Sequence, residues 1–256
     1  MQDLSYKEKQ DRLATRIRAH KEFANFDIDE WIVKFLARRR RHSIFDLGCG
    51  NGNHLHLYLD CVGRDGRVAG LDREATLISE ARQRYRDNAN LELRIGSMDA
   101  PLPFANASFD TSFSNFAIYN ASDPAFTLRE LQRTSQADGE VVLIGPTMNN
   151  ARELYVYNER LTGTAIDEVT LIRTDRLRRE ILPLAKNIFA DVREELINSH
   201  LDFPNPEEFL RYYTATMLYE EGAEKEGKTL TEMQAALRVH GSLIVSKEML
   251  AVIARR

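Results

Sequence analysis

The chain has 256 residues, of which 43% are hydrophobic and 29% charged, and its formal net charge is −4. This length and apolar content suit one α/β domain with an elaboration, and the slight negative charge excludes bulk attraction to nucleic acid. No apolar run approaches the length of a membrane span, and the polar start at residues 1–5 is not a signal peptide, so we expect a cytoplasmic protein. The two cysteines, Cys49 and Cys61, lack metal-type spacing and are expected to be free thiols, with no metal site.

Two helices are predicted before the first strand. Residues 5–20 are rich in Lys, Arg and Glu with apolar positions at Leu13 and Ile17, which is typical of an amphipathic helix that packs on the surface or closes over a ligand. A second helix carries Trp31 and ends in the basic run 38–41. That run either faces solvent at a helix C-terminus, where cations are favoured, or binds phosphates.

A buried strand at residues 43–47 leads into a glycine-rich turn and then into a helix over 54–61. The glycines are Gly48, Gly50 and Gly52, and they leave no side chain over the turn, so a ligand can contact the main chain. Dinucleotide-binding turns use G-x-G-x-x-G, whose third glycine would fall at Asn53. The pattern therefore argues against a dinucleotide site.

Acidic residues follow the next two predicted strands. Residues 68–71 form a short strand that ends at Asp72, which either accepts the hydroxyls of a ribose or caps the following helix. Residues 91–95 alternate between apolar and polar and are followed by Met98 and Asp99. Because parallel strands end at the same edge of a sheet, these residues should lie near the glycine turn.

The next stretch, 109–119, predicts a fourth strand and its exit, and the exit carries Asn115, Tyr119 and Asn120. A helix begins at Asp123–Pro124, and a fifth strand covers 140–144. The residues after Thr147 are too many for a simple crossover, so we expect additional helices that form a cap and contain the tyrosines Tyr155 and Tyr212. The elements expected there are helices at 151–161, 175–186, 207–220 and 230–239, and strands at 191–199 and 243–253.

The D-x-G-x-G-x-G turn from Asp46 to Gly52, together with Asp72 and the segment 97–110, resembles class I S-adenosylmethionine-dependent methyltransferases. The similarity is to the small-molecule type, the UbiE or type 11 group. The resemblance implies a Rossmann-like, mostly parallel seven-stranded sheet in the order 3-2-1-4-5-7-6, with the last strand antiparallel and helices on both faces. It also implies that the turn holds the methionine part of the cofactor, that Asp72 binds its ribose and that the exit of the fourth strand lies beside the sulfonium.

The cofactor-binding residues that the resemblance implies are Asp46, Gly48, Cys49, Gly50, Asn53, Asp72, Arg73, Met98, Asp99 and Asn115. Either Met98 or Asp99 is expected to contact the adenine. Tyr119, Asn120, Tyr155 and Tyr212 are candidates for the acceptor side, although helical spacing alone does not separate pocket residues from core residues. A single domain spanning 1–256 is expected, with N-terminal helices in 1–42, the cofactor-binding core in 43–147 and helical cap elements in 148–190 and 204–240.

The expected function is transfer of a methyl group from S-adenosylmethionine to an O, N or C nucleophile of a small molecule by in-line displacement. An RNA or protein methyltransferase that uses the run 38–41, and a binding protein without catalysis, are the alternatives. The sequence names no general base, since His20 and His54 each have an ordinary structural interpretation. It also gives no indication of the oligomeric state.

Overall fold

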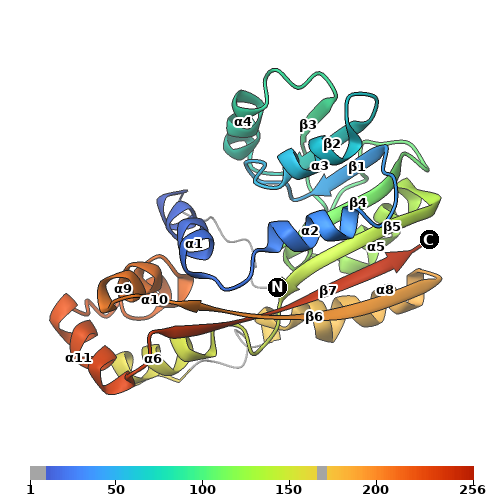
Figure 1. Cartoon of the computed structure of the whole chain (residues 1–256). Helices are drawn as coiled ribbons and strands as arrows, with labels where there is room; N and C mark the ends of the chain where they lie inside the picture. Colours follow the sequence, from blue (N-terminus) through green and yellow to red (C-terminus); the bar gives the residue numbers. More distant parts are fainter. Residues whose placement is uncertain (1–9, 166–171) are drawn as a thin grey trace. The chain divides into compact units, whose positions relative to one another are not determined.

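The structure is a computed structural model that describes residues 10–165 and 172–256. The chain forms two compact units (Figure 1). We call Ile28–Gly145, Arg176–Leu196 and Leu250–Arg256 the sheet unit, and Met1–Asp27, Pro146–Asp175 and Ile197–Met249 the helical unit. The predicted single domain with its core at 43–147 stays a prediction, because compactness alone does not show which parts fold together.

Seven strands form one sheet in the order β3-β2-β1-β4-β5-β7-β6. This confirms the predicted order. β1 pairs in parallel with β2 and β4, β2 with β3, and β4 with β5. The strands are β1 Ser43–Leu47, β2 Arg67–Asp72, β3 Leu91–Ile95, β4 Phe109–Asn115, β5 Ser135–Pro146, β6 Asp191–Asp202 and β7 Ile244–Arg255.

The last strand, β7, is antiparallel to its neighbours. The Ala190 amide donates to the Arg255 carbonyl, whereas the Phe203 amide donates to the Leu243 carbonyl. The beginning of β6 thus meets the end of β7, and the end of β6 meets the beginning of β7, as the opposed arrows of Figure 1 show. The sheet is therefore mixed, with its antiparallel strand where the resemblance implied it.

Helices cover both faces of the sheet unit. Phe45 and Leu47 of β1 belong to a buried cluster with Leu131 of α5 (Pro124–Thr134) and Leu182 of α8 (Leu182–Ile188). On the other face, Phe113 of β4 contacts the rings of α2 (Ile28–Leu36) and α3 (Leu55–Val62). Every residue of β1 is buried, so its apolar run is what a strand covered on both sides requires.

The remaining helices match the predicted segments with a few differences. In the helical unit, Tyr157, Phe209 and Tyr213 pack edge to face at the centre of an aromatic core. The helices not yet given are α1 Gln10–Phe23, α4 Ala75–Arg84, α6 Arg152–Thr162, α9 Pro206–Thr214, α10 Met217–Glu221 and α11 Leu230–His240. The predicted first helix covered 5–20, and its first turn lies outside the described residues.

Two predicted helices are interrupted. The segment predicted as one helix over 175–186 contains a π-helical turn, Leu177–Ile181, before α8 begins. Pro183 lacks the amide that an α-helical bond would need there, and its ring disfavours the regular geometry of the preceding turn. The segment 207–220 is two helices because the Thr216 hydroxyl accepts from the Tyr219 amide and caps a new helix.

One strand boundary was predicted wrongly, and another is now defined. The segment 109–119 divides into the fourth strand, which ends at Asn115, and its exit, where Phe116 takes a left-handed conformation with φ of 53° and a short 3-10 helix, Ile118–Asn120, follows. The fifth strand starts earlier than predicted, because Ser135 pairs with Phe109 before the register shifts. The turn predicted at 137–139 lies within this register shift. The pairing of β5 with β4, and not the local turn signal, therefore sets where the fifth strand begins.

A buried ion-pair network lies at the N-terminal ends of β1 and β4. The Arg41 side chain is only 2% exposed, and its guanidinium donates to Glu140 at 2.8 Å and to the Thr111 hydroxyl at 2.7 Å. Arg39 and Arg255 also contact the Glu140 carboxylate. The basic run 38–41 thus supplies charges that the sheet unit uses internally.

Replacing Arg41 by Met should lower the free energy of unfolding by about 3 kcal/mol, because a buried carboxylate loses its best-aligned donor. Urea denaturation followed by circular dichroism measures the change. The matched control is the exposed neighbour, Arg40→Met, which should alter stability by less than about 0.5 kcal/mol. Equal midpoints for the two variants would show that Arg39 and Arg255 satisfy Glu140 without Arg41.

Candidate functional site

The strand order places a topological switch point between the C-terminal ends of β1 and β4. From β1 the chain continues to β2 on one side, while β4 and β5 lie on the other, so the connections diverge between β1 and β4. Open α/β sheets bind their ligands at such a switch point. Asp46 is paired with Phe113, and two residues further along each strand Gly48 and Asn115 reach the same level at this edge.

The glycine turn requires left-handed backbone. Gly48, Gly50 and Gly52 have φ values of 79°, 54° and 83°. A Cβ on Gly48 would lie 2.3 Å from the Cβ of Ala117, so glycine lets the exit of β4 approach the turn. A Cβ on Gly50 would meet only Leu77, at 4.0 Å, so the main chain there is open to a ligand.

Asp72, at the end of β2, holds the turn in place. One carboxylate oxygen accepts from the Gly50 amide at 2.8 Å, and the other accepts from the Glu74 amide at 2.9 Å. The two alternatives for Asp72, a helix cap and an acceptor for ribose hydroxyls, are therefore compatible, since the residue supports the start of α4 and also lies against the turn. A carboxylate oxygen has lone pairs left after one such bond, so ribose hydroxyls still have acceptors here.

Two further residues of the motif lie under the turn. Asp46 is 2% exposed, and burial followed by the charge of Asp72 raises its pKa from 3.8 to about 8. Cys49 is buried against Gly70, and burial raises the pKa of its thiol well above the ordinary value. The thiol therefore stays protonated, and both groups lie close enough to Asp72 to feel its charge.

Met98 and Asp99 follow β3, as predicted. The Met98 side chain packs against the buried cluster, and its carbonyl accepts from the Thr127 hydroxyl at 3.0 Å. Asp99 is exposed, and its carboxylate accepts from the amide and hydroxyl of Ser122 at 2.7 and 3.1 Å. The Asp99 carboxylate thus fixes the segment after the 3-10 helix, and the assignment of either residue to adenine stays a prediction.

At the end of β4, a chain of polar side chains surrounds Asn115, which is 8% exposed. Its amide nitrogen donates to the Tyr58 hydroxyl at 2.8 Å and lies 3.4 Å from Nδ1 of His54. Nε2 of His54 faces the Asp29 carboxylate at 3.5 Å. No spacing in the sequence links His54, predicted only as a lone histidine, to Asp29 and Tyr58, because α2, α3 and β4 come together only in the fold.

The other predicted residues of the sheet unit lie around the same edge. Tyr119 and Asn120 form the 3-10 helix after β4, and the Tyr119 carbonyl accepts from Arg176 at 2.8 Å. Arg73 lies at the surface beside Glu74, 3.5 Å away. Asn53 lies in the turn before α3 and is partly exposed. Roles for these residues stay predictions.

Tyr155 and Tyr212 belong to the helical unit. Tyr212 is buried against Phe203 and His20, so its ring forms part of the aromatic core. Burial raises the pKa of Tyr155 despite a hydrogen bond with Thr174. Burial, then the positive charges of Lys247 and Arg16, lowers the pKa of His20 to about 2, so this histidine is neutral and unsuited to hold a proton.

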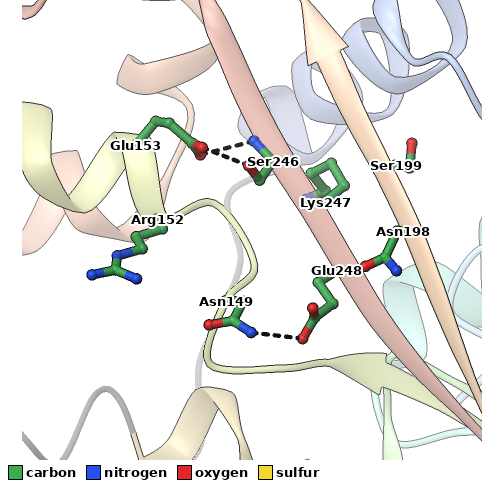
Figure 2. A pocket seen from close by; sticks show the side chains of 8 residues that line it. All are labelled: Asn149, Arg152, Glu153, Asn198, Ser199, Ser246, Lys247 and Glu248. Carbon is green, nitrogen blue, oxygen red and sulfur yellow. Dashed lines mark hydrogen bonds between the residues drawn. The ribbon is translucent and has the colours of Figure 1, made fainter.

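The helical unit also contains a polar cavity of about 330 Å³ (Figure 2). Glu153 accepts from the amide and hydroxyl of Ser246 at 2.8 and 2.5 Å, and Glu248 accepts from Asn149 at 3.1 Å. Both carboxylates are thus engaged with neighbouring side chains or backbone, which joins α6 and the loop before it to β7. The lining residues are Asn149, Arg152, Glu153, Asn198, Ser199, Ser246, Lys247 and Glu248.

Residues 10–165 and 172–256 contain no group of three or more His, Cys, Asp or Glu side chains placed to hold a metal ion. Among those same residues, no helix is long and apolar enough to cross a membrane.

Comparison with known protein families assigns the chain. The family described as methyltransferase domain matches residues 38–181, more than half of the chain and the whole of the switch-point edge. The chain belongs to the class I S-adenosylmethionine-dependent methyltransferases. This confirms the family that the glycine turn, Asp72 and the segment 97–110 indicated.

Curated relatives share this methyltransferase region. A demethylmenaquinone methyltransferase of Lactococcus lactis is 33% identical over 124 residues, covering 45% of this chain and 49% of that protein. A demethylmenaquinone methyltransferase of Staphylococcus aureus is 24% identical over 188 residues, covering 71% of this chain and 70% of that protein. A 37.1 kDa transposon protein of Streptomyces fradiae matches at 31% identity over 32% of its length. The chain thus spans half or less of two of these relatives.

Solved structures agree on the methyltransferase fold. The YcgJ protein of Bacillus subtilis superposes with a TM-score of 0.60 at 13% identity, covering 89% of this chain and 97% of that one. A geranyl diphosphate methyltransferase in complex with GPP and sinefungin gives a TM-score of 0.53 at 15% identity, covering 90% of this chain and 77% of that one. These likenesses extend the shared fold beyond residues 38–181.

S-adenosylmethionine is the cofactor of this methyltransferase family, and the residues of the switch-point edge fit it. The open main chain at Gly50 offers room beside the turn. The Asp72 carboxylate has acceptor capacity left, and the Asn115 side-chain oxygen is buried with no partner among the described residues. The switch-point edge therefore presents acceptors of the kind that hydroxyl and ammonium groups require.

Asp46 should make stability depend on pH. Its pKa is raised to about 8 in the folded chain, so the folded state binds one more proton than the unfolded state between about pH 4 and pH 8. Stability from this group is therefore present at low pH and is lost as pH rises, by about 1.4 kcal/mol per pH unit within that window. Asp46→Asn should remove this slope in urea midpoints measured from pH 5 to 7.5 without cofactor. The control is the exposed Asp65→Asn, and equal slopes for the protein and the Asp46 variant would contradict the assignment.

Proposed function

We propose that the protein transfers a methyl group from S-adenosylmethionine to an O, N or C nucleophile of a small-molecule acceptor. One observation carries this proposal: the glycine turn, Asp72 and the buried amide of Asn115 lie together at the switch point, within the segment that matches the methyltransferase family. Ten residues are proposed to hold the cofactor, namely Asp46, Gly48, Cys49, Gly50, Asn53, Asp72, Arg73, Met98, Asp99 and Asn115.

The cofactor supplies a methyl group on a positively charged sulfur, and displacement removes that charge. The chain's own task is then to orient the two reactants and to exclude water. Asp72 and the left-handed glycine turn provide a rigid wall for the cofactor, because the carboxylate is bonded to the Gly50 amide before any ligand arrives. The adjacent side chains of Cys49 and Asp46 are buried and exclude water from beneath the glycine turn.

A small-molecule acceptor is supported by the relatives, two of which are named as demethylmenaquinone methyltransferases. We propose Tyr119 and Asn120 as acceptor-side residues from the sheet unit, and Tyr155 and Tyr212 from the helical unit. The burial of Tyr212 in the aromatic core favours a supporting role, whereas Tyr155 carries a hydroxyl hydrogen-bonded to Thr174.

Methylation of RNA or protein through the run 38–41 has less support. Arg41 and Arg39 both contact Glu140, and Arg38 lies over the ring of Phe35. Guanidinium groups engaged in this way offer little charge to a phosphate backbone. A cytoplasmic location is also proposed, supported by the free thiols of Cys49 and Cys61.

Calorimetry should detect binding of S-adenosylhomocysteine and none of NADH. Asp72→Ala should weaken the S-adenosylhomocysteine affinity by about 1.5–3 kcal/mol, because charge-assisted hydrogen bonds to the ligand are lost. The control is Asp87→Ala, on an acid whose side chain is 91% exposed, and it should bind like the unaltered protein. NADH binding without a response to S-adenosylhomocysteine would disprove the proposal.

Catalysis itself is tested by mass spectrometry of a panel of phenols, amines, carboxylates and quinol precursors incubated with S-adenosylmethionine. We expect a mass increase of one methyl group on at least one acceptor, and loss of that product in Gly50→Val, whose side chain would occupy the open space beside the turn. The control is Gly63→Val, which has a similar φ of 66° and no neighbour within 4 Å of the added atom. Cofactor binding without turnover of any acceptor would favour the non-catalytic alternative.

A further inference from the structure

A chain of polar side chains runs from Asp29 of α2 through His54 to Asn115 at the end of β4. Its members come from three elements and meet at the switch point, although the family match says nothing of their roles. His54 is 19% exposed and Asp29 is 25% exposed, so the chain leads from the surface to the buried amide.

The first link concerns the protons of His54. A carboxylate oxygen has only lone pairs to offer, so Asp29, 3.5 Å from Nε2, favours the form of the neutral ring that carries its proton on Nε2. The other nitrogen, Nδ1, then has a lone pair and acts as an acceptor. The amide nitrogen of Asn115 lies 3.4 Å from it and supplies the donor.

The second link concerns the orientation of the Asn115 amide. With its nitrogen directed to His54 and to the Tyr58 hydroxyl, both amide protons have acceptors. Burial raises the pKa of Tyr58 well above its ordinary value, so this hydroxyl stays uncharged. The amide oxygen is then left on the other side, buried and with no partner among the described residues. An orphaned buried acceptor destabilises the folded chain unless a ligand satisfies it.

A third observation marks the same place. Phe116, the next residue, has φ of 53°, a left-handed conformation that a bulky side chain seldom adopts. The Phe116 amide still donates to the Ile144 carbonyl at 2.7 Å. The strained backbone is therefore held against β5 at the point where β4 leaves the sheet. Strained backbone of this kind is retained at sites that hold a ligand.

We propose that Asp29 and His54 are positioning residues that fix the Asn115 side-chain oxygen as an acceptor for an N–H or O–H donor of the ligand bound at the switch point. This inference rests on the proposed function for the identity of the ligand. The donor belongs either to the cofactor, as its ammonium group, or to the methyl acceptor. If the proton of His54 moves to Nδ1, the amide has to turn over, and the oxygen no longer faces the ligand.

The state of His54 is measured first, in the protein without ligand. Two-bond nitrogen–proton NMR spectra separate the two neutral forms of a histidine ring, and the signal of His54 among the six histidines is identified by its loss in His54→Phe. We expect the proton on Nε2 in the unaltered protein and on Nδ1 in Asp29→Asn, whose amide can donate to Nε2. A proton on Nδ1 in the unaltered protein overturns the proposal, whatever the protein binds.

The function of the oxygen is measured with ligands. Asn115→Leu should weaken binding tenfold to a hundredfold, and His54→Phe and Asp29→Asn should each weaken it about fivefold to tenfold, since the acceptor is then lost or disoriented. Asn115→Asp keeps the shape and an acceptor oxygen on the ligand side, and should bind better than Asn115→Leu. Matched controls on α3 are His56→Phe and Asp60→Asn, both exposed and expected to have no effect.

The readout distinguishes the two donors. A weaker affinity for S-adenosylhomocysteine in calorimetry assigns the donor to the cofactor, whereas unchanged affinity with a raised KM for the methyl acceptor and an unchanged kcat assigns it to the acceptor. The proposal is overturned if Asn115→Leu leaves both the affinity for S-adenosylhomocysteine and the KM for the methyl acceptor unchanged. It is also overturned if Asn115→Leu has an effect that neither Asp29→Asn nor His54→Phe shares. Failure of the unaltered protein to bind S-adenosylhomocysteine would contradict the proposed function instead, and the NMR result would still decide the positioning of Asn115.

Discussion

The close approach of the β4 exit to the glycine turn is the constraint on which the site depends. Only a hydrogen on Gly48 leaves room for Ala117, because a Cβ would lie 2.3 Å from its side chain. That approach brings β4 level with the turn and places Asn115 beside it. The left-handed backbone of the turn then frees amides, and Asp72 takes one of them from the neighbouring strand.

Charge is distributed differently at the two ends of the sheet unit. At the N-terminal ends of β1 and β4, Arg41 and Glu140 form a buried pair whose charges balance. At the C-terminal ends, burial and then the charge of Asp72 raise the pKa of Asp46 to about 8, so Asp46 is largely neutral at pH 7. The charges at the first end are paired within the chain, whereas the second end holds an amide oxygen, that of Asn115, with no partner among the described residues.

The helical unit is organised by aromatic packing. Tyr157, Phe209 and Tyr213 fill its centre, and the Tyr213 hydroxyl donates to the Asn158 side chain at 2.5 Å. Buried tyrosines satisfy their hydroxyl groups in this way, so their ring alone does not mark a substrate pocket. The polar cavity beside Glu153 and Glu248 is a separate feature of this unit, built from residues of α6, the loop before it, β6 and β7.

Sequence alone determined the glycine turn and the acids after β2 and β3, because each is encoded by local pattern: glycine spacing and a carboxylate at the end of an apolar run. The strand order was implied by the resemblance to the methyltransferase family, and the strand pairing confirms it. The sequence did not determine where β4 ends, since the left-handed Phe116 depends on a bond to Ile144 of β5. The link from Asp29 through His54 to Asn115 likewise joins residues that are far apart in the chain. Only the packing of α2 and α3 on β4 decides which nitrogen of a histidine meets which amide, and no residue spacing encodes that distance.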